Sequence, residues 1–411
     1  MLRSLFSGIS GLRAHQTMMD VTGNNIANVN TAGFKSSSTV FEDTLSQMLK
    51  AAGAPQAGNG GTNPAQVGLG VRLAAINTNF GQGAAQNTGR ATDMMVQGDG
   101  FFVVASGGQQ MYTRAGAFSF DTTGKLTTPE GAVVQGWMAT GGVIDSNGPV
   151  GDIVLPIGTT TAPSATDAST VAGNLKADAP VYNSADPTTA AGHVTTSIDM
   201  YDEIGNKHTV MFDFQKTGAN AWALATAVDG GALSAPTSLD FTGGATWPAG
   251  TLDPATTFTV TFGTTTVDVS LTSLTQFGGE TSASATDANG SPSGTLNAFT
   301  ISPDGTIVGV FSNGMKESLG QIALANFNNP PGLEKVGGSL YRTTVNSGVA
   351  LLGAANTGGR GLLSSGALEM SNVDLAAEFT NLIVAERGFQ ANSRVITTSD
   401  EILQDLVNLK R

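Results

Sequence analysis

Residues 375–403 read LAAEFTNLIVAERGFQANSRVITTSDEIL, and large apolar side chains recur at every seventh position of this stretch. These positions are Leu375, Leu382, Phe389, Ile396 and Leu403. The opposite end of the chain shows the same spacing at Leu5, Leu12, Met19 and Ile26. A seven-residue apolar repeat gives a helix one seam that can be buried against another helix. The sequence therefore predicts helices over residues 1–32 and 371–411 that pair with each other as a coiled coil.

Polar residues mark the inner ends of the two predicted helices. Asn24, Asn25 and Asn28 crowd the end of the first helix and Gly33 follows, which is typical of a helix C-terminus. At the start of the second helix, Ser371 is predicted to be the N-cap, with Asp374 in the position of a capping-box acid.

The chain between the helices is predicted to be mainly β. Apolar and polar residues alternate over 210–214, 258–262 and 267–271, and short polar turns separate such runs. Alternating runs joined by short turns are typical of an antiparallel sheet with one face exposed to water. Residues 101–104 form a compact apolar run that is typical of a buried strand. No helix of useful length is expected between residues 50 and 371.

A chain of 411 residues is too long for one ordinary core, so several domains are expected. We predict a connecting linker over residues 33–70, because residues 53–64 are mostly Gly, Ala, Asn and Pro. A β-rich inner domain is predicted from two separated segments, 71–150 and 300–370. A second β-rich domain, 151–299, is inserted between them. The predicted fold class is therefore mixed, with paired terminal helices and two mainly-β domains, the outer inserted in the inner.

Charge is sparse and unevenly distributed along the chain. Only 12% of the residues are charged, and the formal net charge is −13. Residues 151–310 contain fifteen acidic residues and three lysines, a balance of −12. Because an acidic surface repels nucleic acid and anionic lipid, we expect neither nucleic-acid binding nor membrane insertion. The simplest interpretation of this acidic block is an exposed face that keeps the protein soluble.

The sequence offers no group of residues suited to catalysis. It contains no cysteine, which excludes disulfides, thiolate metal sites and a cysteine nucleophile. The histidines, His15, His193 and His208, lie far apart and at no metal-ligand spacing. The Gly-Asp-Gly fragment at 98–100 precedes an expected strand rather than a helix, which is the wrong context for a phosphate-binding loop. We therefore expect no enzymatic activity, no cofactor and no metal site.

The ends of the chain carry no membrane or secretion signal of the usual kinds. No segment approaches the roughly eighteen continuous apolar residues of a membrane span. Gly8, Gly11 and nearby polar residues interrupt the N-terminus, so no cleaved signal peptide is expected. Two interpretations of the terminal helices stay open on pattern alone. They form an ordinary helical hairpin packed on its own domain, or they are disordered in the monomer and fold on assembly.

The end of the first predicted helix resembles a known family. Residues 24–35 read NNIANVNTAGFK and are similar to the N-terminal signature of bacterial flagellar axial proteins, the group of rod, hook and hook-associated subunits. The signature residues are Asn24, Asn25, Ile26, Ala27, Asn28, Gly33, Phe34 and Lys35. Residues 87–103, 347–353 and 384–393 also resemble this family, and the C-terminal motifs are most similar to its hook members.

The resemblance implies a structural subunit that polymerises into the flagellar hook, the flexible tubular joint between the basal-body rod and the filament. In that family both termini form a coiled-coil inner tube. The implied partners are further copies of the chain, the distal rod protein, the hook cap, the hook–filament junction proteins and the flagellar type III export apparatus. The implied location is outside the cell, reached without cleavage of a signal peptide. For the family's export motif, an aromatic residue followed four residues later by an apolar one, Phe6 is mismatched by Ser10, whereas Leu5 pairs with Ile9.

Two rival functions fit parts of the sequence. A distal rod protein of the same family has similar helices but lacks a large inserted domain, so the block 151–299 favours the hook. A secreted β-rich adhesin fits the Thr- and Gly-rich composition. It explains neither the seven-residue repeats at both tips nor the missing signal peptide.

Overall fold

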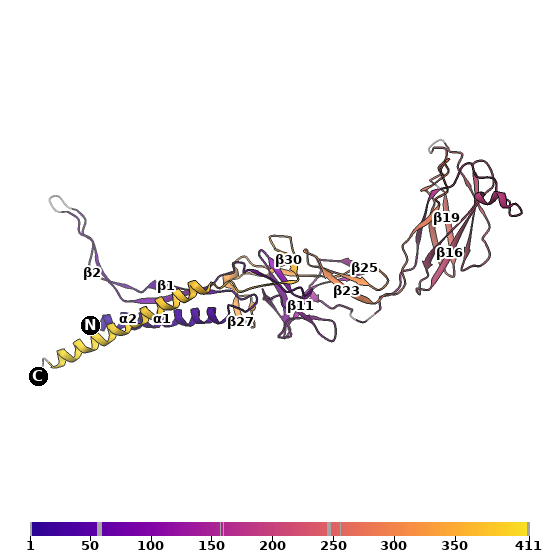
Figure 1. Ribbon diagram of the computed structural model, residues 1–411. Helices are drawn as coiled ribbons and strands as arrows, with labels where there is room; N and C mark the ends of the chain where they lie inside the picture. The colour runs from indigo at the N-terminus through magenta and orange to yellow at the C-terminus, as the bar shows by residue number, and fades with distance from the viewer. Residues whose placement is uncertain are drawn as a thin grey trace. The chain divides into compact units, whose positions relative to one another are not determined.

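The computed structural model describes residues 2–55, 60–156, 158, 160–244, 248–254 and 256–408. The chain divides into two compact units (Figure 1). Unit 1 comprises Met1–Leu155, Phe299–Val308 and Ser318–Arg411, and unit 2 comprises Pro156–Ala298 and Gly309–Glu317. Within the described residues, the α-helices lie at the two ends of the sequence and the rest is mostly β, as the sequence predicts. The short helices between them, η1 (Pro187–Gly192) and η2 (Pro330–Gly332), are of the 3-10 type.

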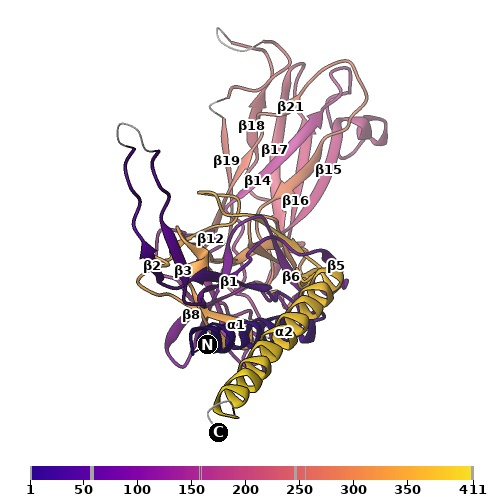
Figure 2. The same cartoon turned by 90° about the vertical axis from the view of Figure 1, so that its left-hand side faces the viewer.

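Helix α1 (Leu2–Ala27) and helix α2 (Leu375–Asn408) lie side by side and run in opposite directions (Figures 1 and 2). The N-cap of α2 differs from the prediction. The side chain of Asp374, not Ser371, accepts hydrogen bonds from the backbone N–H groups of Ala376 (2.9 Å) and Ala377 (3.2 Å). The helix begins one residue after Asp374, because a carboxylate at that position satisfies N–H groups that otherwise lack an intrahelical partner.

The segment 33–70, predicted to be a linker, forms strands instead. Strand β1 (Ser37–Asp43) pairs antiparallel with β4 (Val71–Thr78), and β2 (Ser46–Lys50) pairs with β3 (Ala65–Gly68). The β1–β4 ribbon lies against α1, so its strands are stabilised by a tertiary contact that local composition does not reveal.

Unit 1 is centred on one large sheet. Its main path runs β23-β24-β25-β11-β7-β8-β28-β27. The strands of this sheet are β7 (Phe101–Ser106), β8 (Gln109–Thr113), β9 (Ser119–Phe120), β10 (Leu126–Thr127), β11 (Val133–Thr140), β12 (Val143–Ile144), β13 (Gly151–Asp152), β23 (Leu296–Ile301), β24 (Thr306–Phe311), β25 (Lys316–Ile322), β26 (Leu324–Asn326), β27 (Glu334–Gly337), β28 (Leu340–Arg342) and β29 (Leu351–Gly353). The predicted buried strand at 101–104 is β7, and all four of these residues are buried. Its central position joins strands from both halves of the sequence.

Two short ladders connect the sheet region to the terminal helices. Strand β30 (Leu362–Ser365) pairs with β6 (Met94–Gln97), and β31 (Ala367–Glu369) pairs with β5 (Ala85–Asn87). Strand β31 ends five residues before Asp374, the capping residue of α2. Its pairing with β5 therefore fixes the start of α2 to the N-terminal half of the chain.

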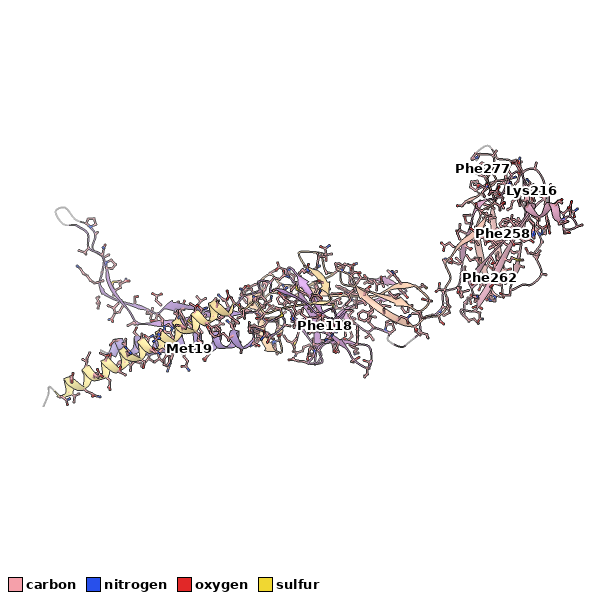
Figure 3. All side chains as sticks on the ribbon, in the orientation of Figure 1. Met19, Phe118, Lys216, Phe258, Phe262 and Phe277 are labelled. Atoms are coloured by element: carbon pink, nitrogen blue, oxygen red, sulfur yellow. The ribbon has the colours of Figure 1, made fainter. Side chains whose placement is uncertain are left out.

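Unit 2 consists of two sheets that share one core. One sheet has the order β15-β16-β17-β18, and the other has β19-β20-β14-β21 with β22 beside β14. The strands are β14 (Ala168–Asn174), β15 (His193–Tyr201), β16 (Lys207–Lys216), β17 (Ala221–Val228), β18 (Thr237–Asp240), β19 (Thr257–Phe262), β20 (Thr265–Ser270), β21 (Leu274–Thr275) and β22 (Ser284–Ala288). The alternating residues Phe258, Val260 and Phe262 point into this core, as predicted, and Figure 3 labels the two phenylalanines.

Candidate functional site

The two terminal helices approach each other through small residues. A Cβ atom at Gly11 would lie 2.8 Å from the side-chain amide of Asn392, and one at Gly388 would lie 2.5 Å from the ring of His15. Among the helix residues whose burial the structure describes, the buried ones are Gly8, Gly11, Ala14, Thr22 and Asn25 on α1, and Ala385 and Ser399 on α2. The helices therefore pack closely because glycines on one helix leave room for side chains of the other, such as Asn392 at Gly11.

The nine residues predicted to form the assembly seam lie on these two helices. Those that are half-buried in the single chain are Leu5, Leu12, Met19, Ile26, Leu382, Phe389, Ile396 and Leu403. Leu375 is exposed. The structure brings Ile396 against α1, where it faces Gly8, with 3.4 Å between its Cγ1 atom and a Cβ built at the glycine. Sequence reasoning missed the close-packed row because it treated Gly8 and Gly11 only as interruptions of an apolar stretch.

Both helices expose large apolar side chains after they have paired. On α1, Phe6 is 66% exposed and Ile9 is also exposed. Together with Leu5, they are the residues considered for the export motif. On α2, the exposed large apolar residues are Leu375, Phe379, Ile383, Val384, Val395, Ile402 and Val407. A single copy of the chain therefore leaves much of the apolar surface of its terminal helices in water, which is typical of a surface that another protein covers.

The signature residues at the end of α1 hold the helix to its surroundings. Asn25 is buried, and its amide nitrogen donates to the backbone oxygen of Ser37 (2.7 Å) and to the Glu378 carboxylate on α2 (2.8 Å). Its amide oxygen accepts from the Ser37 N–H (3.0 Å). The Asn28 side chain donates to the backbone oxygen of Asn24 (2.9 Å), which also accepts from the Asn28 N–H (3.2 Å) at the helix end. One signature residue thus joins α1, β1 and α2.

Gly33 is required by its backbone conformation and by its neighbours. Its φ angle is +69°, in the left-handed region that favours glycine. A Cβ atom there would lie 2.5 Å from the backbone nitrogen of Ala115. Its N–H donates to the backbone oxygen of Glu369 at 2.7 Å, so the turn after α1 contacts the strand that precedes α2.

A buried cluster of charged side chains lies at this junction. The Lys35 ammonium is 2.6 Å from the Glu369 carboxylate, and neither side chain is exposed. The Arg114 guanidinium approaches the other Glu369 oxygen at 3.6 Å and lies over the ring of Phe101. Lys35 also donates to the backbone oxygen of Gly81 at 2.8 Å. We call Lys35, Glu369 and Arg114 the junction triad, because they join the N-terminal signature, the central sheet and the strand before α2.

Burial dominates the electrostatics of the junction triad. It lowers the pKa of Lys35 and the pKa of Arg114, although Glu369 opposes both shifts. Burial also raises the pKa of the neighbouring Tyr341 to about 12. Glu369 forms ion pairs with both buried cations, so its loss would remove the ion-pair partner of each and leave Asp99 as a negative charge that acts on Arg114. The triad therefore acts as a structural clamp whose central residue is Glu369.

The described part of the chain shows no group of three or more His, Asp or Glu side chains that could hold a metal ion. It also contains no helix with the length and apolar character needed to cross a membrane.

Comparison with known proteins assigns the chain to a family. It is 40% identical to the "Flagellar hook protein FlgE" of Borreliella burgdorferi, over the full length of both chains. The chain belongs to the flagellar hook and basal-body rod protein family. Family models match in four places: "Flagella basal body rod protein" at residues 5–35, "Flagellar hook protein FlgE/F/G D1 domain" at 95–178, "Flagellar basal body protein FlaE D2 domain" at 169–302, and "Flagellar basal body rod FlgEFG protein C-terminal" at 364–409.

Two further proteins are similar to the chain, one in sequence and one in fold. It is 34% identical to the "Flagellar basal-body rod protein FlgG" of Bacillus subtilis over the full length of both chains. The crystal structure of Helicobacter pylori flagellar hook protein FlgE2 matches with a TM-score of 0.54 and 16% identity, covering 69% of this chain and 100% of that one. At this identity the structural match supports the fold alone.

Proposed function

We propose that this chain is the structural subunit of the flagellar hook and polymerises into the flexible tube between the basal-body rod and the filament. The observation that carries the proposal is the exposed apolar surface on two helices that are already paired. Burying a large apolar side chain fully is worth about 1.5–3 kcal/mol, and these residues still expose a third or more of their surface. Each copy in a tube can cover this surface on its neighbours, so the stabilisation recurs in every subunit.

In the proposed tube, both terminal helices form the inner coiled-coil layer. The seam residues predicted from the sequence then complete their burial against other copies rather than within one chain. Unit 2 forms the outer layer and carries most of the acidic block, so its negative charge faces water. Because unit 2 is inserted between two segments of unit 1, the domain boundaries lie near residues 150 and 300. We propose no catalytic role for any residue.

The proposed partners are the proteins that flank a hook: the distal rod protein, the hook cap and the hook–filament junction proteins. Export through the flagellar type III apparatus would deliver the chain outside the cell without signal cleavage. The exposed side chains of Phe6 and Ile9 are available to that apparatus before assembly, and we propose Leu5–Ile9 as the segment it recognises. A rod subunit is the rival within the family. The hook is favoured because the chain is more similar to the hook protein of Borreliella burgdorferi (40% identity) than to the rod protein of Bacillus subtilis (34%), both over their full length.

Immunogold electron microscopy of basal bodies from the source bacterium tests the proposal. Antibodies against unit 2 should label the curved tube outside the cell, and deletion of the gene should remove that tube and abolish swimming. Labelling of the rod, with an intact curved tube in the deletion strain, would contradict the hook assignment.

A further inference from the structure

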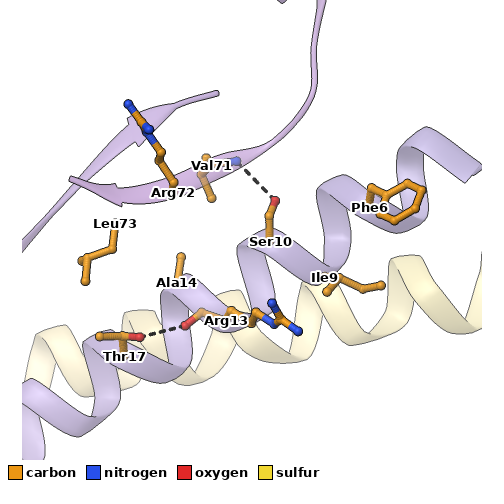
Figure 4. Close-up of a pocket in the computed structure, with 9 residues that line it drawn as sticks. All are labelled: Phe6, Ile9, Ser10, Arg13, Ala14, Thr17, Val71, Arg72 and Leu73. Carbon is orange, nitrogen blue, oxygen red and sulfur yellow. Dashed lines mark hydrogen bonds between the residues drawn. The ribbon is translucent and has the colours of Figure 1, made fainter. Parts of the chain in front are cut away.

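A groove lies between α1 and the β1–β4 ribbon. It has a volume of about 400 Å³ and is lined by Phe6, Ile9, Ser10, Arg13, Ala14, Thr17, Val71, Arg72 and Leu73 (Figure 4). The Ser10 hydroxyl accepts a hydrogen bond from the Val71 N–H at 3.2 Å, which fixes the ribbon on the helix. Phe6, Ile9, Val71 and Leu73 are all exposed, so the groove presents an open apolar surface.

Among the described residues, the lining of the groove carries one unpaired positive charge, on Arg13. Arg13 is exposed and takes part in no ion pair with any residue that the structure describes. Arg72 points away from α1 in Figure 4 and pairs with Glu42. The first turn of α1 contains no acidic residue, so the positive end of the helix dipole is not neutralised within that turn. An occupant of the groove should therefore combine an apolar side chain with a carboxylate.

The end of α2 has this combination and projects beyond α1. Ser4 of α1 lies beside Ser399, with 3.5 Å between their hydroxyl oxygens. Because the helices are antiparallel and α1 begins at Leu2, the last turns of α2 extend past the start of α1, as Figures 1 and 2 show. Ile402 is 47% exposed on this overhang. Asp405 is exposed and lies three residues further on, and therefore on the same helix face.

We propose that the groove receives the C-terminal end of α2 from a second copy of the chain, with Ile402 among the apolar residues and Asp405 paired with Arg13. The inference rests on the proposed function and names a contact within the polymer. It joins two different surfaces of the chain, and such a contact links copies into an open series rather than a closed dimer.

A contact within one chain is excluded by geometry. Arg13 lies between Gly11, which faces Asn392, and His15, which faces Gly388. Asp405 is thirteen residues beyond Asn392, a distance of about 20 Å along an α-helix. The arginine and the aspartate can therefore meet only between copies.

Cysteine cross-linking in assembled tubes tests the contact, because the chain contains no cysteine of its own. The variant Ile9→Cys/Ile402→Cys should give a ladder of multimers on non-reducing gels after oxidation. The matched control Ile9→Cys/Ile383→Cys has a site elsewhere on α2 that is at least as exposed as Ile402, and it should give no ladder. Tubes of the first variant without a ladder would overturn the inference and leave the hook assignment intact. A ladder from Ile9→Cys/Met48→Cys instead would show that the β2–β3 ribbon occupies the groove, which also overturns it.

A charge exchange provides a second, independent test at exposed positions that do not contribute to the core. Arg13→Asp should lower the yield of sedimentable tubes about tenfold, because it places two negative charges together. Adding Asp405→Arg should restore the yield. An unchanged yield in the single variant, or no recovery in the double variant, would contradict the pairing. Failure of the unmodified chain to form tubes would count against the proposed function instead.

Discussion

The terminal helices and unit 2 bury their apolar residues in opposite ways. In unit 2, Phe212, Phe214 and Trp222 are fully buried in a core that both sheets of the unit share. On the helices, Phe6, Phe379 and other large apolar residues stay exposed, whereas glycines and other small residues form the contact. Even Met19 on α1, labelled in Figure 3, is only half-buried. Unit 2 completes its apolar core within one chain, whereas the helices do not. The helices are therefore the part of the chain whose apolar surface is buried on assembly.

The largest effect is expected from a change that widens the close contact between the helices. Gly11→Leu places a large side chain against Asn392 and should abolish tube formation. The matched change Gly23→Leu should assemble normally, because a Cβ atom at Gly23 meets nothing within 4 Å. Both changes raise helix propensity by a similar amount, up to about 1 kcal/mol, so the difference reports packing alone. Sedimentation and electron microscopy measure the outcome, and equal assembly of the two variants would contradict the close-packed contact.

A second pair of variants separates assembly from stability. Phe389→Ala should prevent tube formation and leave the melting of unit 2 unchanged, because Phe389 lies on α2 and is only half-buried in the single chain. Phe214→Ala should lower the stability of unit 2 by about 3–5 kcal/mol, since it empties part of a closed core. Calorimetry of the monomers and sedimentation of the polymers give the two readouts. If Phe389→Ala lowers the melting temperature of unit 2, Phe389 contributes to the fold of the single chain, and the separation of assembly residues from stability residues is wrong.

The junction triad should be most sensitive at its single carboxylate. Glu369→Gln removes the ion-pair partner that the buried side chains of Lys35 and Arg114 share, and should destabilise unit 1 by about 3–5 kcal/mol. Lys35→Met should cost less, because the Arg114–Glu369 pair remains. Glu334→Gln, at an exposed pair with Arg342, should change stability by less than about 1 kcal/mol. Chemical denaturation ranks the three variants, and a larger loss for Lys35→Met than for Glu369→Gln would refute the central role of the carboxylate.

The smallest expected effect is a pH dependence in unit 2. The hydrogen bond from His208 to Asp229, at 2.7 Å, raises the pKa of His208, so protonated His208 is favoured in the folded state. Its stabilising contribution is present below the unfolded pKa of about 6.5 and is lost as pH rises through the folded pKa. Unit 2 should therefore melt at a slightly lower temperature at pH 8 than at pH 6. The melting temperature of the His208→Gln variant should depend less on pH. An unaltered pH dependence in this variant would exclude His208 as its source.

The elements with strong local patterns could be predicted from the sequence. The seven-residue repeats predicted both helices, and the alternation at 258–262 predicted a strand with one buried face. Features that depend on distant contacts could not. Strand β1 is stabilised by its contact with α1, and Lys35 meets a carboxylate 334 positions away in the sequence. The role of Gly11 depends on how closely a second helix approaches, which a single helical pattern does not specify.

Hydrogen exchange of backbone amides, measured on the monomer and on the polymer, distinguishes a helical core that one chain completes from one that needs neighbouring copies. We expect strong protection of unit 2 in both states, and rapid exchange in α1 and α2 of the monomer that becomes slow in the polymer. Strong protection of both helices in the monomer, equal to that in the polymer, would show that one chain already completes their core and would contradict assembly by shared burial.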